Sequence, residues 1–301
     1  MSVEPLIYDT APIGESVGPI AYTIPADYNR RRLAALGLAE DAFLPGTGWA
    51  EPSLLCGQHS WVMRQRFSWQ GSVHAKCDIA LARPVALGAR IHVTCRLAAK
   101  YERRGGRYVV FSLETRDDKG DPACHVENSM LLNFREVAAR RRDETGASKP
   151  DATVPADGRP APTIDFGPAT LGHDDIVEFF AAEEAVYGPH PSLHNRKDIA
   201  QAAGLPDVIA PGRYSIALMN CMFARLYGVS WLSGTRYSVR FLQNLLPGLR
   251  LRATATAEGH GDAQAFRIAS IDEIKKRPVL SGTVSFAGGP REVGPAADAA
   301  S

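Results

Sequence analysis

The apolar positions of the chain form two similar series, each of which is a helical stretch followed by strand-like runs. In the second series, apolar side chains recur at positions 214, 217, 218, 221, 222 and 226. This spacing of three and four residues predicts a helix over 214–227, and its apolar character on several sides predicts that the helix is buried. A shorter stretch with helical spacing around Trp61 and Val62 begins the first series.

Apolar runs that are typical of strands follow each helical stretch. The predicted strands are 74–81, 90–98, 108–115 and 128–134 in the first half, and 235–241, 249–257, 265–272 and 279–286 in the second. A further helix over 174–186, capped by Asp174 or Asp175, opens the second half. One helix and an antiparallel meander are therefore used twice, and we expect each sheet to wrap around a nearly buried helix.

A segment with almost no apolar periodicity separates the two halves. Residues 137–163 are rich in Pro, Ala, Gly and charged side chains, which is typical of a linker, and the run 140–142 within it is expected to be solvated. We therefore predict an N-terminal domain over 1–136, a C-terminal domain over 164–288 and a frayed tail over 289–301.

The composition excludes several classes of protein. The 34 Lys and Arg residues are balanced by 33 Asp and Glu residues, so the charge excess of a broadly basic nucleic-acid binder is missing. No apolar run approaches the roughly 20 residues that span a bilayer, and the N-terminal residues lack the pattern of a signal peptide. We expect a cytoplasmic protein without a membrane partner.

The five cysteines indicate neither disulfides nor a metal site. Their number is odd and no CxxC pair occurs, so we expect small buried side chains in a reducing compartment (Cys56, Cys77, Cys95, Cys124 and Cys221). Glycine-rich phosphate motifs and a GxSxG motif are also missing from the sequence. No metal and no cofactor is expected.

Two segments of the second half resemble the MaoC-like (R)-specific enoyl-CoA hydratases. Residues 187–194, Tyr-Gly-Pro-His-Pro-Ser-Leu-His, resemble the family's motif, which reads roughly [ST]-G-D-x-N-P-[LIV]-H. Residues 208–212, Val-Ile-Ala-Pro-Gly, resemble its I-A-H-G segment, and Gly212 follows His194 by the family's usual 18 residues. The resemblance covers about 20–135 and 165–286 and implies an α+β double hotdog, in which two curved antiparallel sheets each wrap a long central helix.

The resemblance implies that His194 is the acid/base and that the Gly212 amide forms the oxyanion hole. Enolate chemistry on a thioester needs such a base and such a donor, and the unpaired N–H groups at a helix start supply donors with partial positive charge. The family's Asp is replaced by Pro189, which cannot accept a proton. The local candidates that could replace it are His190, Tyr187 and Ser192.

Four further residues are candidates for substrate binding. Ser192 and Asn195 flank the motif histidine, where Asn195 can instead stabilise the loop. Arg213 lies beside the positive end of the helix dipole and needs an anion, for which a substrate phosphate or carboxylate is one explanation. Asn220 lies on the same face as Gly212 and needs a partner in an apolar helix. Glu183 and Glu184 are expected to be solvated.

These residues leave several functions open. The first hypothesis is a hydratase or dehydratase, a lyase acting on an acyl-CoA or acyl-carrier-protein thioester. The alternatives on the same scaffold are a repurposed isomerase or cyclase and a non-catalytic acyl-binding subunit. A thioesterase ranks last because 213–227 contains no Asp or Glu. Two fused hotdogs already form a pseudo-dimer, so a monomer and a homodimer both fit.

Overall fold

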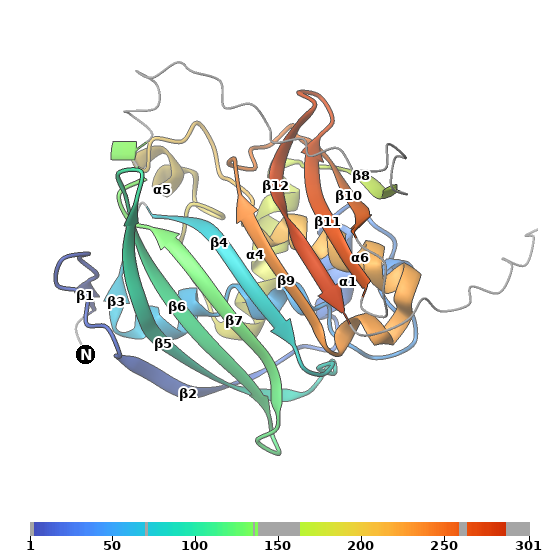
Figure 1. Ribbon diagram of the computed structural model, residues 1–301, viewed down its shortest axis with the longest axis horizontal. Coiled ribbons are helices and arrows are strands. Elements are labelled where there is room, and N and C mark those ends of the chain that lie inside the picture. The colour runs from blue at the N-terminus through green and yellow to red at the C-terminus, as the bar shows by residue number, and fades with distance from the viewer. Residues whose placement is uncertain (1–2, 70–71, 135, 138–162, 259–263, 287–301) are drawn as a thin grey trace, which may run out of the picture.

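A single antiparallel sheet of ten strands joins the two halves of the chain (Figure 1). The computed structural model describes residues 3–69, 72–134, 136–137, 163–258 and 264–286. The strands of the first half in this sheet are β2 (Ser16–Thr23), β4 (Val73–Leu81), β5 (Arg90–Arg103), β6 (Gly106–Asp117) and β7 (Pro122–Leu131). Those of the second half are β8 (Thr163–Thr170), β9 (Thr235–Phe241), β10 (Arg250–Glu258), β11 (Gln264–Asp272) and β12 (Arg277–Phe286).

The order of the strands shows how the halves are fused. It is β2-β5-β6-β7-β4-β9-β12-β11-β10-β8, so each half contributes five neighbouring strands. The two halves meet where β4 pairs with β9, with Cys77 opposite Val239. Both of these side chains are buried, which ties the junction to the core. The two predicted sheets are therefore one continuous curved sheet. A short parallel pair, β1 (Glu4–Pro5) and β3 (Phe67–Ser68), lies outside it.

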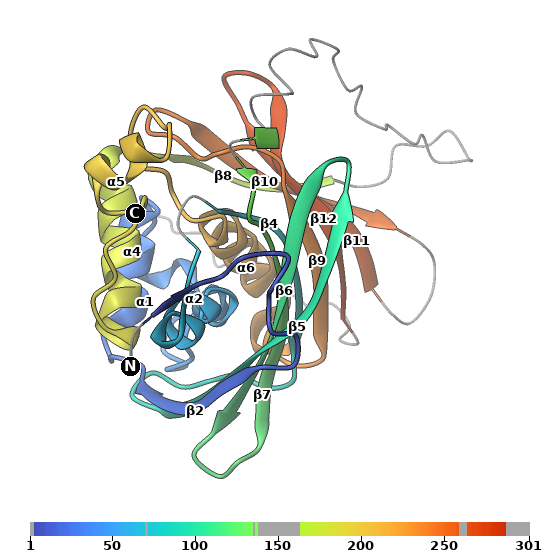
Figure 2. The same ribbon diagram turned by 90° about the vertical axis from the view of Figure 1, so that its left-hand side faces the viewer.

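The helices lie on the concave side of the sheet. They are α1 (Tyr28–Ala35), α2 (His59–Val62), α4 (His173–Tyr187), α5 (Lys197–Ala202) and α6 (Arg213–Tyr227). Figure 2 shows α2 and α6 between the sheet and an outer pair formed by α1 and α4. Almost every side chain of α6 is buried, which confirms the prediction of a buried helix over 214–227.

The central segment of the first half is much less regular. It consists of a 3-10 turn over Pro52–Cys56, the four-residue α2 and a second 3-10 turn over Met63–Gln65. Gly57 separates the first turn from α2 and lies against Arg213, because a Cβ added at Gly57 would be 2.7 Å from the Arg213 Cζ. The expectation of a long central helix in each half is thus correct only for the second half.

Three further findings concern the cysteines, the length of the helices and the predicted linker. The five cysteines all lie in the described part of the chain, where they are buried and unpaired. No helix among the described residues is long and apolar enough to cross a membrane. The predicted linker lies outside the described residues except for its two end positions, and so do the run 140–142 and the tail over 289–301.

Candidate active site

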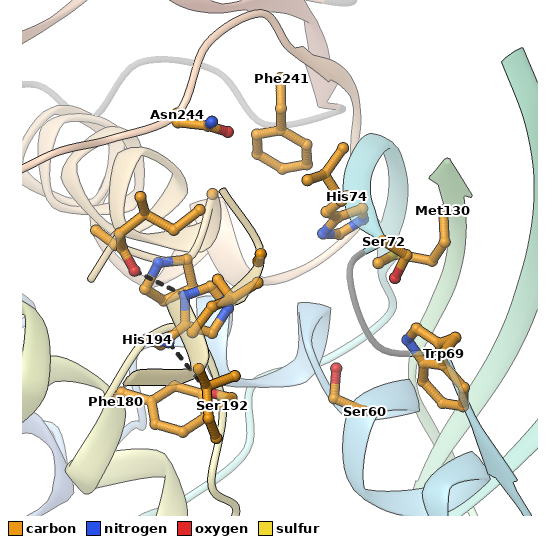
Figure 3. Close-up of a pocket in the computed structure, with 18 of the residues that line it drawn as sticks. Ser60, Trp69, Ser72, His74, Met130, Phe180, Ser192, His194, Phe241 and Asn244 are labelled. Carbon is orange, nitrogen blue, oxygen red and sulfur yellow. Dashed lines mark hydrogen bonds between the residues drawn. The ribbon is translucent and has the colours of Figure 1, made fainter. Parts of the chain in front are cut away.

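A pocket of about 580 Å³ lies where the two halves meet, beside the first turn of α6. Side chains from both halves line it (Figure 3). The first half contributes His59, Ser60, Arg64, Trp69, Ser72 and His74, among others. The second half contributes His190, Ser192, His194, Gly212, Arg213 and Phe241, among others. The pocket therefore brings together five of the eight predicted site residues.

His194 is held with one nitrogen available for chemistry. Its Nδ1 lies 2.7 Å from the carbonyl oxygen of Ile209. Because a carbonyl only accepts, Nδ1 carries the proton and Nε2 keeps its lone pair. The backbone N–H of His194 donates to the Ser192 hydroxyl at 3.2 Å. Burial, and then the charge of Arg213, lowers the pKa of His194 to about 3, so the ring is neutral at physiological pH.

The start of α6 faces the same pocket. Gly212 is the N-cap residue, and among the described residues its backbone N–H has no hydrogen-bond acceptor. The free N–H and the helix dipole together favour a developing negative charge at this point. Gly212 also has a steric role, because a Cβ there would lie 2.4 Å from the Phe241 ring.

His190 lines the pocket close to His194, and its ring packs against aromatic side chains. Its ring lies 5.4 Å from the Trp61 ring, and its backbone N–H donates to Glu184 at 2.6 Å. Burial, followed by the charges of Arg64 and Arg213, lowers the pKa of His190 to about 3. His190 is therefore a second neutral imidazole in the cavity wall.

Three predicted residues lie away from the pocket lining, which corrects their assigned roles. The Tyr187 hydroxyl donates to the Leu54 carbonyl at 3.2 Å, and its ring is packed in the core. The Asn195 side chain accepts from the Ser192 N–H at 2.9 Å, so it fixes the motif loop. Asn220 has buried partners at both ends of its amide, since it donates to Glu51 and accepts from Trp231. Each of these three side chains is thus hydrogen-bonded to other groups of the protein.

The anion that Arg213 needs is supplied by the protein. Its guanidinium donates to both carboxylate oxygens of Glu183, which is fully buried. Arg32 of α1 also donates to Glu183, at 2.7 Å, and lies 3.7 Å from Glu51. The expectation that Glu183 is solvated is therefore wrong. Glu184 is half-buried, and its carboxylate accepts from the His190 N–H and the Asn195 amide. Two arginines and two carboxylates form a neutral buried network that links the halves.

Sequence reasoning missed a histidine pair in the first half. The Asn128 amide nitrogen donates to the Cys56 carbonyl at 2.7 Å and to His59 Nδ1 at 2.8 Å. The Asn128 oxygen accepts from His74 Nε2 at 2.7 Å. The amide thus selects the tautomer of both rings, with the proton of His59 on Nε2. Burial lowers the pKa of His74 to about 4 and holds that of His59 well below its usual value.

A sequence signal for this cluster exists but is weak. His74 and Asn128 are polar residues that open two predicted strands, and β4 pairs with β7 in the sheet. The His74 ring lies 4.6 Å from the Phe241 ring, which in turn covers Gly212. The first half therefore reaches the start of α6, which the motif alone does not indicate.

Comparison with known proteins identifies the architecture. No family model and no curated protein matches the chain. Among solved structures, a MaoC-like dehydratase from Phytophthora capsici is 13% identical, with 94% of this chain and 98% of that chain covered and a TM-score of 0.65. HtdX of Mycobacterium tuberculosis is 22% identical, with coverages of 90% and 99% and a TM-score of 0.58.

A third solved structure gives the arrangement its name. A conserved hypothetical protein of Mycobacterium tuberculosis, described as having a double hotdog fold, matches with a TM-score of 0.60, 12% identity and coverages of 96% and 99%. This chain is a double hotdog. The double hotdog expected from the motif resemblance is thus confirmed, and at these identities the likeness concerns the fold alone.

Proposed function

We propose that this double hotdog is a hydratase or dehydratase of acyl thioesters carried by coenzyme A or a carrier protein. The observation that supports this most strongly is the joint placement of His194 and Gly212. In the described part of the chain, an imidazole whose Nε2 has no partner and a helix-opening N–H without an acceptor line the same pocket. These are the base and the oxyanion donor that chemistry at the α- and β-carbons of a thioester requires. MaoC-like dehydratases share the fold.

In the hydration direction, His194 Nε2 takes a proton from water while the water oxygen bonds to the β-carbon of a 2-enoyl thioester. The electron pair of the double bond moves to the thioester oxygen, and the Gly212 N–H donates to the resulting enolate. The imidazolium then returns its proton to the α-carbon, which gives the 3-hydroxyacyl thioester. Removal of one such donor typically costs about 3–4 kcal/mol in the transition state.

The low pKa of His194 fits a base that acts only on bound substrate. A pKa of about 3 keeps the imidazole unprotonated before reaction, although it also makes the ring a weak base. Negative charge that develops on the thioester oxygen stabilises the imidazolium and raises its pKa during the reaction. The pocket thus supplies basicity when the enolate forms.

Pro189, which stands where the family motif has an Asp, favours a second candidate function, that of an isomerase or cyclase. Among the pocket-lining residues that the structure describes, the one carboxylate is Glu136, which is exposed and bonds to Asn133 at 3.3 Å. A lone imidazole can move a proton between carbons, or take one from a substrate hydroxyl that adds intramolecularly, without a carboxylate to orient water.

The His194→Gln variant tests both candidates. We expect turnover of enoyl thioesters, followed by loss of their absorbance, to fall about 10²–10⁴-fold, because the base is removed. The matched control is His173→Gln, an exposed histidine at the start of α4, which should leave turnover unchanged. Equal activity of wild type and His194→Gln would contradict the proposal.

Product analysis in deuterated water separates the two candidates. Hydration adds the mass of water to the acyl group, whereas isomerisation leaves the composition unchanged apart from deuterium gained from solvent. Intramolecular cyclisation of a hydroxy-enoyl thioester also leaves the composition unchanged but removes the double bond. The absence of all three products across chain lengths would count against catalysis at this pocket.

A further inference from the structure

One cation of the pocket has no counter-ion among the described residues. Arg64 lies in the 3-10 turn after α2 and lines the pocket. Its Nε is buried and has no hydrogen-bond partner in the part of the chain that the structure describes, and burial lowers the pKa of its guanidinium to about 10. The other lining arginine, Arg213, is neutralised by Glu183. An unpaired guanidinium in a cavity wall is costly unless a ligand supplies the missing anion.

The position of Arg64 places its charge inside the cavity. Its guanidinium carbon lies 5.2 Å from the centre of the buried Trp69 ring, which holds the side chain by a cation–π contact. Figure 3 shows Trp69, Ser60 and Ser72 together on the wall that faces His194. The charge of Arg64 also contributes to lowering the pKa of His190 and of His194. Arg64 therefore acts on the same space as the proposed base.

The buried groups of the described pocket lining leave one positive charge, that of Arg64, without an opposite partner. The four histidines have pKa values lowered by burial, so they are neutral near pH 7. Arg213 and Glu183 cancel, and Glu136 is exposed. As far as the lining is described, the interior thus presents one uncompensated positive charge beside neutral imidazoles and hydroxyls. This pattern is complementary to an anion that arrives with the substrate.

We propose that Arg64 binds a carboxylate on the acyl group, so that the substrates are thioesters of dicarboxylic acids. The inference rests on the proposed function and names its substrate class. A planar carboxylate matches the fork of a guanidinium, and the serine hydroxyls of the same wall can donate to it. The phosphates of a carrier are a second source of negative charge. However, the pantetheine arm keeps these phosphates far from the reacting thioester. Arg64, in contrast, lines the same pocket as His194, and its charge contributes to lowering the pKa of that ring.

Matched substrates and two neighbouring arginines test the inference. Wild type should prefer an enoyl thioester with a terminal carboxylate over its uncharged analogue in kcat/KM. Arg64→Gln should lose roughly 10- to 150-fold on the dicarboxylic substrate, the range for a charged hydrogen bond, and little on the uncharged one. The control Arg66→Gln removes an exposed arginine that pairs with Glu15 at 3.1 Å, and it should leave both values unchanged.

The carrier is varied to exclude the phosphates as the anion. The same acyl groups are supplied on N-acetylcysteamine, which contains no phosphate. The loss in Arg64→Gln should persist for the dicarboxylic acyl group on this short carrier. A loss that appears only with coenzyme A thioesters, whatever the acyl group, would overturn the inference.

Direct binding separates failure of the inference from failure of the proposed function. Glutarate is titrated calorimetrically into wild type, Arg64→Gln and Arg66→Gln, with thermal unfolding as a check that each variant is folded. Binding that depends on Arg64, without turnover of any thioester, would support the carboxylate site and overturn the proposed function. Turnover of both substrate types that is insensitive to Arg64→Gln would support the function and overturn the carboxylate site.

Discussion

The two halves of the molecule share a scaffold but differ in the segment that the sheet encloses. The first strand that each half contributes to the ten-stranded sheet, β2 or β8, contains a Gly-Pro pair, at 18–19 and 167–168. Each glycine has a positive φ, and a Cβ would lie 2.5 Å from the Val93 carbonyl at Gly18 and 3.0 Å from the Leu251 carbonyl at Gly167. The close approach of the paired strand therefore requires glycine in both halves.

The enclosed segments have diverged to different tasks. In the second half, α6 is a continuous buried helix whose first turn faces the pocket. In the first half, the corresponding segment is broken into short turns that carry His59 and Arg64 to the opposite wall. The half without the family motif thus also contributes residues to the pocket. It builds one wall of the pocket, and the regular half supplies the proposed base, His194, and the start of α6.

The largest expected effect comes from breaking the charge network that links the halves. Glu183→Gln leaves Arg32 and Arg213 buried with less counter-charge. Loss of one partner of a buried ion pair typically costs about 3–5 kcal/mol, and we expect a decrease of this size in the free energy of unfolding in urea. A single cooperative transition should remain, because the sheet is continuous.

The control for this prediction lies on the same helix. Glu178 is 64% exposed and lies 3.7 Å from Arg31, so Glu178→Gln removes only a surface pair. Such pairs contribute less than about 1 kcal/mol. Equal destabilisation by the two variants would show that Glu183 is not the link between the halves.

Eight of the ten strands of the sheet and the helices α4 and α6 were predicted from the sequence, because each shows a local periodicity of apolar residues. Strands β2 and β8 and helix α1 were not predicted, and the strand expected at 128–134 is β7, which spans Pro122–Leu131. The double hotdog itself was expected from the motif resemblance. The helix over 214–227 and the strands after it follow directly from the spacing of apolar residues. Glu183 was missed because its partner Arg32 is 151 positions away, and no local pattern shows that pairing. The steric role of Gly212 was missed for the same reason, since Phe241 meets it only in the folded sheet.

Motif spacing located part of the site but could not place every side chain. His194, His190 and Ser192 are brought to the pocket by the loop itself. Asn220 lies on a helix that is buried all round, so its position in the sequence cannot tell which neighbour it meets. The wall from the first half carries no family motif, and it becomes visible only when β4 and the broken segment are placed beside α6.

A smaller effect is expected from releasing the broken segment of the first half. Asn128→Leu removes bonds to the Cys56 carbonyl, His59 and His74, and a buried group that loses its partner costs about 1–3 kcal/mol. We expect urea unfolding to shift by an amount in this range. The control is Asn244→Leu, a half-buried amide of the second half that lines the same pocket, with a change within about 0.5 kcal/mol. Comparable losses in both variants would mean that Asn128 does not anchor the segment.

The smallest expected effect is a change in the pH dependence of stability, and it compares the histidines of the two walls. The pKa of His194 is about 3 and that of His74 about 4, whereas an unfolded histidine has a pKa of about 6.5. Between pH 6.5 and these values the unfolded chain binds protons that the native chain does not. Stability therefore falls as the pH falls, by about 1.4 kcal/mol per pH unit for each such histidine.

Replacement of either ring should make this slope shallower without reversing its sign. His194→Gln and His74→Gln should each remove about 1.4 kcal/mol per pH unit between pH 6 and 4.5, measured by urea unfolding at several pH values. Ser72→Ala changes the same pocket but removes no titrating group, so its slope should match wild type. If only His194→Gln makes the slope shallower, burial lowers the histidine pKa only in the half that carries the motif. If both do, the two walls hold their imidazoles neutral together, and the site is shared between the halves.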